Sequence, residues 1–225
     1  MKKEDGQVMK DRYKIVRVRK EECEPFIMDI HYAKRMPPIT YAYGLYDRDG
    51  GIFGTGELVG IITYGTPFSC TLRTGIAGKE YEKHVLELNR LCLLNNKKNE
   101  ASMLVGASLK MLPKDFIVVS FADSGQNHHG CVYQATNFLY TGLSAKRSDY
   151  HMKGKENKHH QTLLQEFIGS EHRTKDMLDK YGDLMYRKER SRKHRYIIFT
   201  GNKRFKKQAL KSLKYEIKPY PKRTE

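Results

Sequence analysis

The sequence has no tryptophan and only four cysteines among its 225 residues. The missing tryptophan excludes no class of protein. The cysteines stand far apart, at positions 23, 70, 92 and 131, so no pair has the short spacing of a zinc knuckle or a redox motif. Cys92 and Cys131 fall in apolar segments, where a buried thiol is ordinary. The cysteines therefore predict a reducing compartment.

Long apolar runs are missing as well. The first ten residues, MKKEDGQVMK, hold no apolar core of signal-peptide length, and no stretch approaches the length of a membrane span. We therefore predict a soluble intracellular protein without a membrane partner, or a phage or plasmid protein made inside a bacterial cell.

Acidic residues are scarce beside basic ones, with 26 Asp and Glu against 42 Lys and Arg, which gives a formal net charge of +16. A hydrophobic fraction of 39% is typical of a globular chain that can bury a core. The positive excess favours a polyanionic partner, nucleic acid first and an anionic membrane surface second. A merely soluble basic protein would show the same balance, so charge alone names no reaction.

The predicted core runs from residue 84 to residue 140. Residues 85–94 form a Val- and Leu-rich strand pattern, 103–112 have helical spacing, and 116–121 read as a buried central strand. A strand, a helix and a second strand make a right-handed crossover. Ligands usually bind beyond the carboxyl ends of such strands. The pattern therefore predicts an open α/β sheet with a site at that edge.

Segments on either side of the core extend this prediction. Apolar periodicity and turn residues predict strands over 13–18, 41–46, 57–64 and 215–217, helices over 21–34, 131–140 and 204–213, and a hairpin of 184–187 with 195–199. Two stretches, 68–83 and 150–175, are expected to be irregular loops.

Two polar features of the core lie at the ends of its elements, and each has a structural alternative. Ser102 and Gly106 near a helix start would let a phosphate approach, or they would simply cap the helix and pack on the sheet. Asp123 follows the central strand, where a carboxylate could act as a base or orient an amine, or could cap the next turn.

Three further features contain rings. His128 and His129 form a poor metal pair, because adjacent loop residues point apart, and one could cap the next helix. Tyr133 could hand over a proton or pack in the core. The stretch His31–Arg35 gathers polar rings and two cations, and is either part of a site or a solvated helix end.

The joint arrangement resembles the acyl-coenzyme A core of the GNAT acyltransferase superfamily. More closely, ELNRL, NEASMLVGASLKML, SFADSGQNHHGCVYQATNF and the upstream HYAKRMP resemble the phage Mom family of DNA-modification proteins. The resemblance implies a GNAT-like α/β fold with a mixed, partly parallel central sheet and helices on both faces. It implies a single domain over 1–225, with a core of about 13–145 and a basic part, 146–225, that completes the sheet and contacts DNA.

The resemblance also implies an activity. It would be the conversion of adenine in double-stranded DNA to N6-carbamoylmethyl adenine, which protects phage DNA from host restriction in the bacterial cytoplasm. Acetyl-coenzyme A is implied as a cofactor, and iron has been linked to the family. By motif match His31, Tyr32, Arg90, Ser102, Asp123 and Tyr133 fall on positions of the family. With their neighbours they give the expected site: the catalytic residues are His31, Tyr32, Asp123 and Tyr133; the cofactor-binding residues are Arg90, Leu91, Leu93, Ser102 and Gly106; the DNA-binding residues are Lys34, Arg35, His128, His129, Lys146 and Arg147; and His31 with Asp123 would hold any metal.

One departure and two alternatives stay open at this point. The helix after the first core strand reads Ser102-Met103-Leu104-Val105-Gly106-Ala107 and lacks the superfamily's usual Arg/Gln-x-x-Gly-x-Gly/Ala form. A GNAT N-acetyltransferase acting on a small amine or a protein lysine would keep the same core. A non-catalytic nucleic-acid-binding protein would keep the same charge. The sequence leaves a homodimer open.

Overall fold

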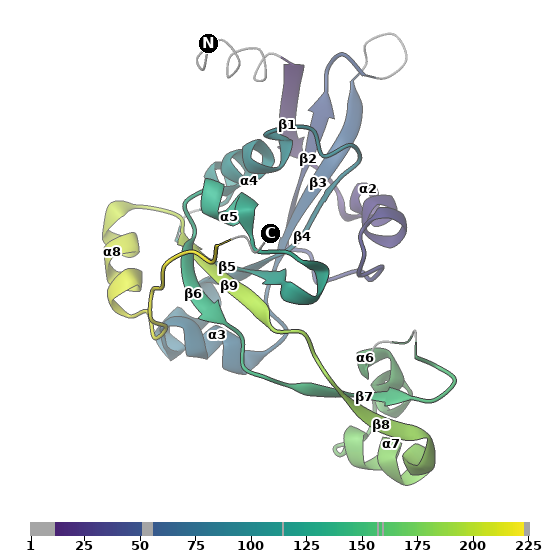
Figure 1. Cartoon of the computed structure of the whole chain (residues 1–225). Coiled ribbons are helices and arrows are strands. Elements are labelled where there is room, and N and C mark those ends of the chain that lie inside the picture. Colours follow the sequence, from purple (N-terminus) through teal and green to yellow (C-terminus); the bar gives the residue numbers. More distant parts are fainter. Residues whose placement is uncertain (1–11, 51–55, 114, 157, 159, 223–225) are drawn as a thin grey trace. The chain divides into compact units, whose positions relative to one another are not determined.

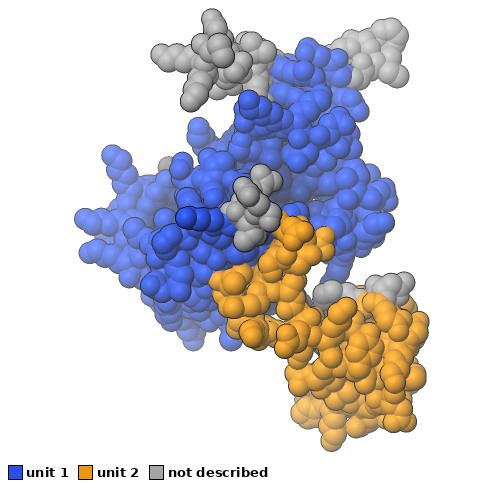
Figure 2. Space-filling model, in the orientation of Figure 1, with its two compact units in different colours: residues 1–122, 128–142, 194–225 blue, residues 123–127, 143–193 orange. Residues whose placement is uncertain are grey.

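The computed structural model describes residues 12–50, 56–113, 115–156, 158 and 160–222. The chain forms two compact units, coloured separately in Figure 2. Unit 1 takes residues 1–122, 128–142 and 194–225, and unit 2 takes 123–127 and 143–193. Among the described residues, no helix is long and apolar enough to cross a membrane.

Unit 1 is built on a seven-stranded mixed sheet in the order β1-β2-β3-β4-β5-β9-β6 (Figure 1). The pairs from β1 to β4 are antiparallel, and β4 pairs with β5 in parallel. The strands are β1 (Tyr13–Arg17), β2 (Tyr41–Asp47), β3 (Glu57–Gly65), β4 (Val85–Leu93), β5 (Ile117–Asp123), β6 (Leu139–Leu143) and β9 (Lys193–Phe199).

The parallel pair β4–β5 opens along its length. Its register runs from Val85 opposite Ile117 to Leu88 opposite Ser120. Both strands continue beyond this point, β4 to Leu93 and β5 to Asp123. Two strands that part in this way leave a wedge at the middle of the sheet, which is where the predicted site residues are concentrated.

Helices cover both faces of the sheet, as predicted. On one face Leu104 and Tyr133 pack in the same core as Val118, and on the other Ile76 packs with Ile117. This is the alternation of side chains expected of a central strand buried on both sides. The first face carries α4 (Glu100–Met111) and α5 (Cys131–Ala135); the second carries α2 (Lys20–Pro25), η1 (Phe26–Ile30), α3 (Cys70–Ala77) and α8 (Lys203–Lys211).

The predicted helix over 21–34 ends earlier. After α2 the chain widens into the π-helical turn η1, closed by the His31 N–H donating to the Phe26 carbonyl at 2.9 Å. His31 then takes an extended backbone conformation. The stretch His31–Arg35 is therefore a loop rather than a helix end.

Two other sequence predictions were wrong for local reasons. The stretch 68–83 is not irregular: it contains α3 and the 3-10 helix η3 (Lys79–His84), and the Ser69 hydroxyl caps α3 by accepting from the Leu72 N–H at 3.2 Å. The predicted helix over 131–140 stops after α5, because Asn137 adopts a left-handed conformation with φ of 61° before β6.

Unit 2 is a small α/β unit formed by the stretch between β6 and β9 together with residues 123–127, which end β5 and follow it. Its core consists of Met152, Leu163, Leu164 and Met177. It contains η4 (Ser124–Gln126), β7 (Ser148–Met152), α6 (His160–Leu163), η5 (Leu164–Phe167), α7 (Arg173–Tyr181), η6 (Gly182–Leu184) and β8 (Met185–Glu189). The stretch 150–175, expected to be a loop, therefore holds a strand end and helices.

The C-terminal strands pair differently from the prediction. β8 pairs with β7, whereas β9 joins the large sheet, so 184–187 and 195–199 form no hairpin. Residues 215–217 form no strand; instead the Lys214 and Lys218 N–H groups donate to the carbonyls of Ile76 and Tyr140. The helix predicted over 204–213 is confirmed as α8.

Candidate active site

Three segments that are distant in the sequence bring rings and cations together in unit 1. The His31 ring stacks on Tyr32 with ring centroids 4.5 Å apart, and Tyr32 meets the edge of His128 at 6.1 Å. The Arg90 Nη2 donates to the Arg35 carbonyl at 2.7 Å. These residues, which the sequence assigned to catalysis, cofactor binding and DNA binding, thus form one polar cluster.

Arg90 is the buried cation of this polar cluster. Its Nη1 donates to the Asn89 carbonyl at 2.6 Å, while its Nε is buried and has no hydrogen-bond partner among the described residues. Burial lowers the Arg90 pKa, and the nearby Tyr32 and Glu87 oppose that effect. An unfilled donor on a buried guanidinium suits a ligand oxygen.

His31 is held as a neutral imidazole. Burial first, and then the neighbouring Arg90 and His128, lower its pKa to about 4. Its Nδ1 accepts from the Ala33 N–H at 3.1 Å, so the single proton of the neutral ring is on Nε2. His31 therefore offers a hydrogen-bond donor to a ligand, and this geometry does not favour the role of base.

Tyr133 projects from α5 into the core beside the polar cluster. Its pKa is raised to about 12, chiefly by burial, with smaller effects of Tyr32 and Glu87 and an opposing hydrogen bond with Ser120. The Ser120 hydroxyl in turn donates to the Leu88 carbonyl at 3.0 Å, at the last paired position of β4 and β5. Tyr133 is thus a protonated donor near the opening of the sheet.

Glu87 is a site residue that the sequence did not predict. Its carboxylate lies near enough to Tyr133 and Arg90 to raise the pKa of both. Asn89, two residues on, accepts from the Thr63 hydroxyl at 2.6 Å and donates to the Pro38 carbonyl at 2.8 Å, which ties the loop containing His31 to the sheet. The available signal was two polar residues in one phase of an otherwise apolar strand.

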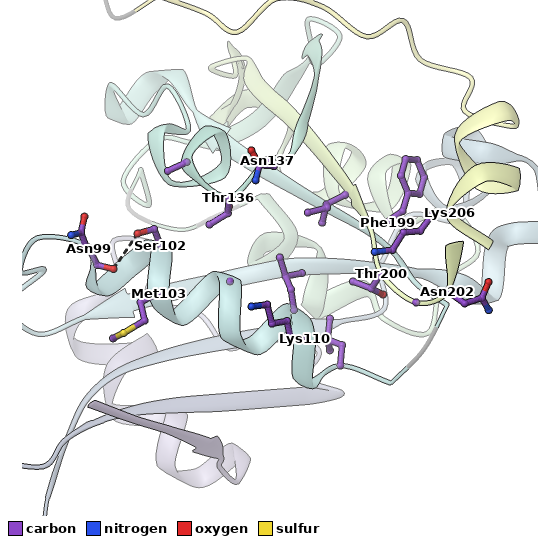
Figure 3. Close-up of a pocket in the computed structure, with 16 residues that line it drawn as sticks. Asn99, Ser102, Met103, Lys110, Thr136, Asn137, Phe199, Thr200, Asn202 and Lys206 are labelled. Atoms are coloured by element: carbon purple, nitrogen blue, oxygen red, sulfur yellow. Dashed lines mark hydrogen bonds between the residues drawn. The ribbon is translucent and has the colours of Figure 1, made fainter. Parts of the chain in front are cut away.

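A cavity of about 810 Å³ lies along α4 (Figure 3). Figure 3 shows Asn99 and Ser102 near one end of α4 and Lys110 near the other, with Lys206 of α8 reaching toward the cavity. Ser102 and Gly106 line it as predicted, together with Thr136 and Asn137. A Cβ added at Gly106 would meet nothing within 4 Å, so the cavity reaches the helix backbone there.

The remaining predicted cofactor residues lie elsewhere on β4. Leu91 and Leu93 are partly buried and pack against the main core. Neither they nor Arg90 belongs to the lining of the cavity. The cavity and the polar cluster nevertheless adjoin the same short segment, because Tyr133 is followed by Ala135–Asn137 in the cavity wall.

Asp123 belongs to unit 2 and is already engaged there. Its carboxylate accepts from the Gly125 N–H at 2.9 Å and from the Ser191 hydroxyl, and lies 3.6 Å from the Lys193 ammonium. This is the turn-capping arrangement that the sequence offered as the alternative to a catalytic role. A catalytic role for Asp123 stays a prediction.

The other predicted DNA-binding residues are distributed over both units. His129 lies beside His194 in unit 1, with ring centroids 5.7 Å apart, and its carbonyl accepts from the Tyr196 hydroxyl. Lys34 in unit 1, and Lys146 and Arg147 in unit 2, are exposed.

The iron that the resemblance implied has no ligand set in the described part of the chain. No three His, Cys, Asp or Glu side chains there are grouped so that they could hold a metal ion. The pair predicted for a metal, His31 and Asp123, is divided between unit 1 and unit 2.

The sequence matches the model of the Mom protein family over residues 12–222. It is 27% identical over 226 residues to the methylcarbamoylase Mom of Escherichia phage Mu, covering 97% of this chain and 88% of the relative.

Two solved structures are similar in fold. One is Arabidopsis thaliana NAA60 in complex with a bisubstrate analogue, with a TM-score of 0.50, 11% identity, and coverage of 83% of this chain and 97% of the plant protein. The other is an acetyltransferase of the GNAT family from Bacillus cereus, with a TM-score of 0.42, 12% identity, and coverage of 84% and 99%. The chain therefore has a GNAT-like mixed α/β fold.

Proposed function

Because the chain belongs to the Mom protein family, we propose that it is a DNA-modification transferase that converts adenine in double-stranded DNA to N6-carbamoylmethyl adenine. The observation that carries this proposal is the meeting of two features at α5. Tyr133 faces the polar cluster, and the residues that follow it, Ala135–Asn137, line the cavity along α4. An acyl cofactor in the cavity and a target adenine at the polar cluster would meet at α5.

The cavity fits acetyl-coenzyme A, which would supply a two-carbon unit activated as a thioester. Its volume of about 810 Å³ falls in the range of small-molecule sites. Lys110 and Lys206 line it and would neutralise phosphates. The open backbone at Gly106 admits close approach, and Ser102 lies in the first turn of a twelve-residue helix. Arg90 does not line the cavity, and its unfilled Nε would donate to a ligand oxygen at the polar cluster.

The polar cluster would handle the protons of the reaction. The adenine N6 amine is a weak nucleophile, and it must lose a proton as its new bond to carbon forms. Glu87 is the carboxylate that unit 1 offers beside Tyr133 and Arg90, and we assign it as base. Tyr133, with its raised pKa, would give a proton to the coenzyme A thiolate, which departs when a nitrogen donor replaces it on the carbonyl carbon to form the amide.

The rings of the polar cluster would position the target adenine. Tyr32 is 51% exposed and offers a stacking surface to an adenine, backed by His31. The Nε2–H of His31 would donate to a ring nitrogen. Asp123 would orient the amine only if its carboxylate left its partners in unit 2.

Formation of the carbamoylmethyl product requires reactants beyond those of a simple acetyl transfer. It is joined to N6 through the methylene carbon and carries one additional NH compared with an acetyl group. A nitrogen donor and a two-electron oxidant must therefore take part beside the acetyl group. Simple acetylation of N6 would need neither, and the two products differ in mass by NH.

The basic residues would hold the DNA. Arg35 and His128 belong to the polar cluster, Lys34 precedes Arg35 in the same loop, and the exposed Lys146 and Arg147 of unit 2 would contact phosphates. We propose that both units act as one DNA-modifying domain over 1–225 in the cytoplasm of a phage-infected or lysogenic host. A GNAT N-acetyltransferase acting on a small amine or protein lysine is the alternative, but it would not need a net charge of +16.

Restriction protection tests the proposal. Plasmid DNA from cells that express the wild-type chain is expected to resist endonucleases whose sites contain adenine, because the bulky N6 group blocks them. DNA from cells expressing Tyr133→Phe should be cut normally, since the proton donor is gone. Equal cutting of DNA from both strains and from empty-vector cells would contradict the proposal.

A further inference from the structure

Phe68 is the most exposed large apolar side chain in the described part of the chain. It is 87% exposed, against 62% for Ile168 and 51% for Tyr32. It follows Pro67 and lies just before α3, in a stretch without regular structure. A single exposed apolar side chain is ordinary on a protein surface, so what Phe68 can do depends on where its backbone is held and what lies near it.

The backbone beneath Phe68 is held in place. Arg73 Nη1 donates to the Pro67 carbonyl at 2.8 Å and to the Phe68 carbonyl at 3.5 Å. The same guanidinium donates through Nε and Nη2 to Glu82 at 3.1 and 2.9 Å. Ser69 caps the helix that follows. The ring is therefore presented on a fixed loop.

This loop begins beside Glu87. Gly65, the last residue of β3, is paired with Glu87. It also touches the loop that contains His31, since a Cβ added at Gly65 would be 1.9 Å from the Pro38 carbonyl oxygen. Three residues of chain span at most about 10 Å. Phe68 therefore lies within about 10 Å of Gly65, in the same unit as the polar cluster.

Adenine modification creates a need that this ring fits. The N6 amine of a paired adenine cannot enter a protein site inside the duplex, so the base must leave the stack. Proteins fill the gap that results with an apolar wedge, and aromatic rings stack well on bases. The exposed cations Lys34 and Arg35, in the loop that contains His31, would hold the flanking phosphates.

We propose that Phe68 inserts into the base stack of duplex DNA and holds the target adenine in its extruded position. This inference rests on the proposed function and adds a positioning residue to it. Arg73 would support the wedge through the loop carbonyls. The occupant of this surface is thus the stacked DNA next to the target base.

The test compares two DNA substrates with Phe68→Ala in extracts of the expressing cells, because the product requires a nitrogen donor and an oxidant that the purified chain does not supply. In one, the target adenine is fully paired; in the other, it is unpaired in a bulge. We expect Phe68→Ala to modify the paired target roughly 10- to 100-fold more slowly than the wild type, the range expected when one aromatic ring no longer stacks on a base. The bulged target should be modified within about threefold of the wild-type rate. Phe68→Trp should retain activity on both, and Ile168→Ala serves as the matched exposed control.

A fluorescence readout isolates extrusion from chemistry. A 2-aminopurine at the target position brightens when it leaves the stack, and Phe68→Ala should lose that signal while it still binds the duplex. If Phe68→Ala modified the paired target at the wild-type rate, the inference would be wrong, and the proposed function would still stand. Equal loss on both substrates, or a change of oligomeric state, would overturn it too. If the wild type modified neither substrate, the proposed function itself would fail.

Discussion

At the scale of single residues, the site is defined by two groups whose pKa values are shifted in opposite directions. Burial lowers that of His31 to about 4 and raises that of Tyr133 to about 12. Both side chains are therefore neutral, and each keeps a hydrogen-bond donor, over the whole range around pH 7. The proton acceptor of the reaction must be a third group, which we propose is Glu87, the carboxylate whose charge helps to raise the Tyr133 pKa.

The lowered His31 pKa predicts a specific pH dependence of stability. The ordinary pKa of histidine is 6.5, so as the pH falls the His31 ring takes up a proton near pH 6.5 in the unfolded chain but only near pH 4 in the folded chain. Stability contributed by neutral His31 is complete above pH 6.5 and is lost as the pH falls toward 4. We expect the melting temperature of the wild type to fall more steeply over this range than that of His31→Gln. Parallel curves for the two proteins would contradict the burial of the His31 ring.

Sequence reasoning found most residues of the polar cluster and missed Glu87. His31, Tyr32, Arg90 and Tyr133 stand in motifs that can be read without coordinates. Glu87 could not be assigned because the role of a polar residue in a strand depends on the side chains that folding brings near it. Here those side chains are Tyr133 of α5 and Arg90 of the same strand.

At the scale of elements, the segment from β4 to β5 was predicted almost to the residue. Its strands are Val- and Leu-rich, its helix is periodic, and Pro113 ends that helix. The failures were short elements set by tertiary contacts. α3 is only eight residues long, and after α5 ends at Ala135 a left-handed Asn137 turns the chain into β6, which a periodicity argument cannot detect.

The helix α4 allows the cavity to be tested as a cofactor site. We expect Gly106→Leu to fold, because its Cβ meets open space and Leu is a better helix former than Gly by roughly 0.8 kcal/mol. The larger side chain should fill the cavity and weaken acetyl-coenzyme A binding, measured by calorimetry, by about tenfold or more. Gly169→Leu, also with open space around its Cβ, is the control. Unchanged affinity in Gly106→Leu would place the cofactor elsewhere.

At the scale of the whole molecule, the proposal assigns part of the positive charge, including Lys146 and Arg147 of unit 2, to contacts with DNA phosphates. Sequence analysis predicted the basic surplus of the C-terminal part but not the separate core of Met152, Leu163, Leu164 and Met177. Methionine and leucine positions scattered among lysines gave no clear period. The pairing of β8 with β7 was equally hidden, because β9 lies closer to β8 in sequence than β7 does.

The charge predicts a salt-dependent affinity for duplex DNA. Log affinity should fall linearly with log salt, and removing one cation that binds a phosphate should reduce the slope by about one. We expect Lys146→Glu with Arg147→Glu to weaken binding and to reduce the slope by about two, measured by fluorescence anisotropy. Lys14→Glu with Lys20→Glu, exposed cations on β1 and α2, gives the same change in net charge. Equal effects of both double variants would mean that net charge, not this location, governs binding.

The central claim is that the polar cluster and the adjoining cavity build a carbamoylmethyl group on adenine N6 in DNA. Mass spectrometry of nucleosides, digested from plasmid DNA of cells that express the protein, tests it most directly. The account predicts a deoxyadenosine heavier by one carbamoylmethyl group, absent from cells expressing Glu87→Gln. A deoxyadenosine lighter than this by NH would identify simple acetylation instead. Only unmodified nucleosides, from cells with soluble protein that binds acetyl-coenzyme A, would contradict the claim and favour an amine or protein lysine as acceptor.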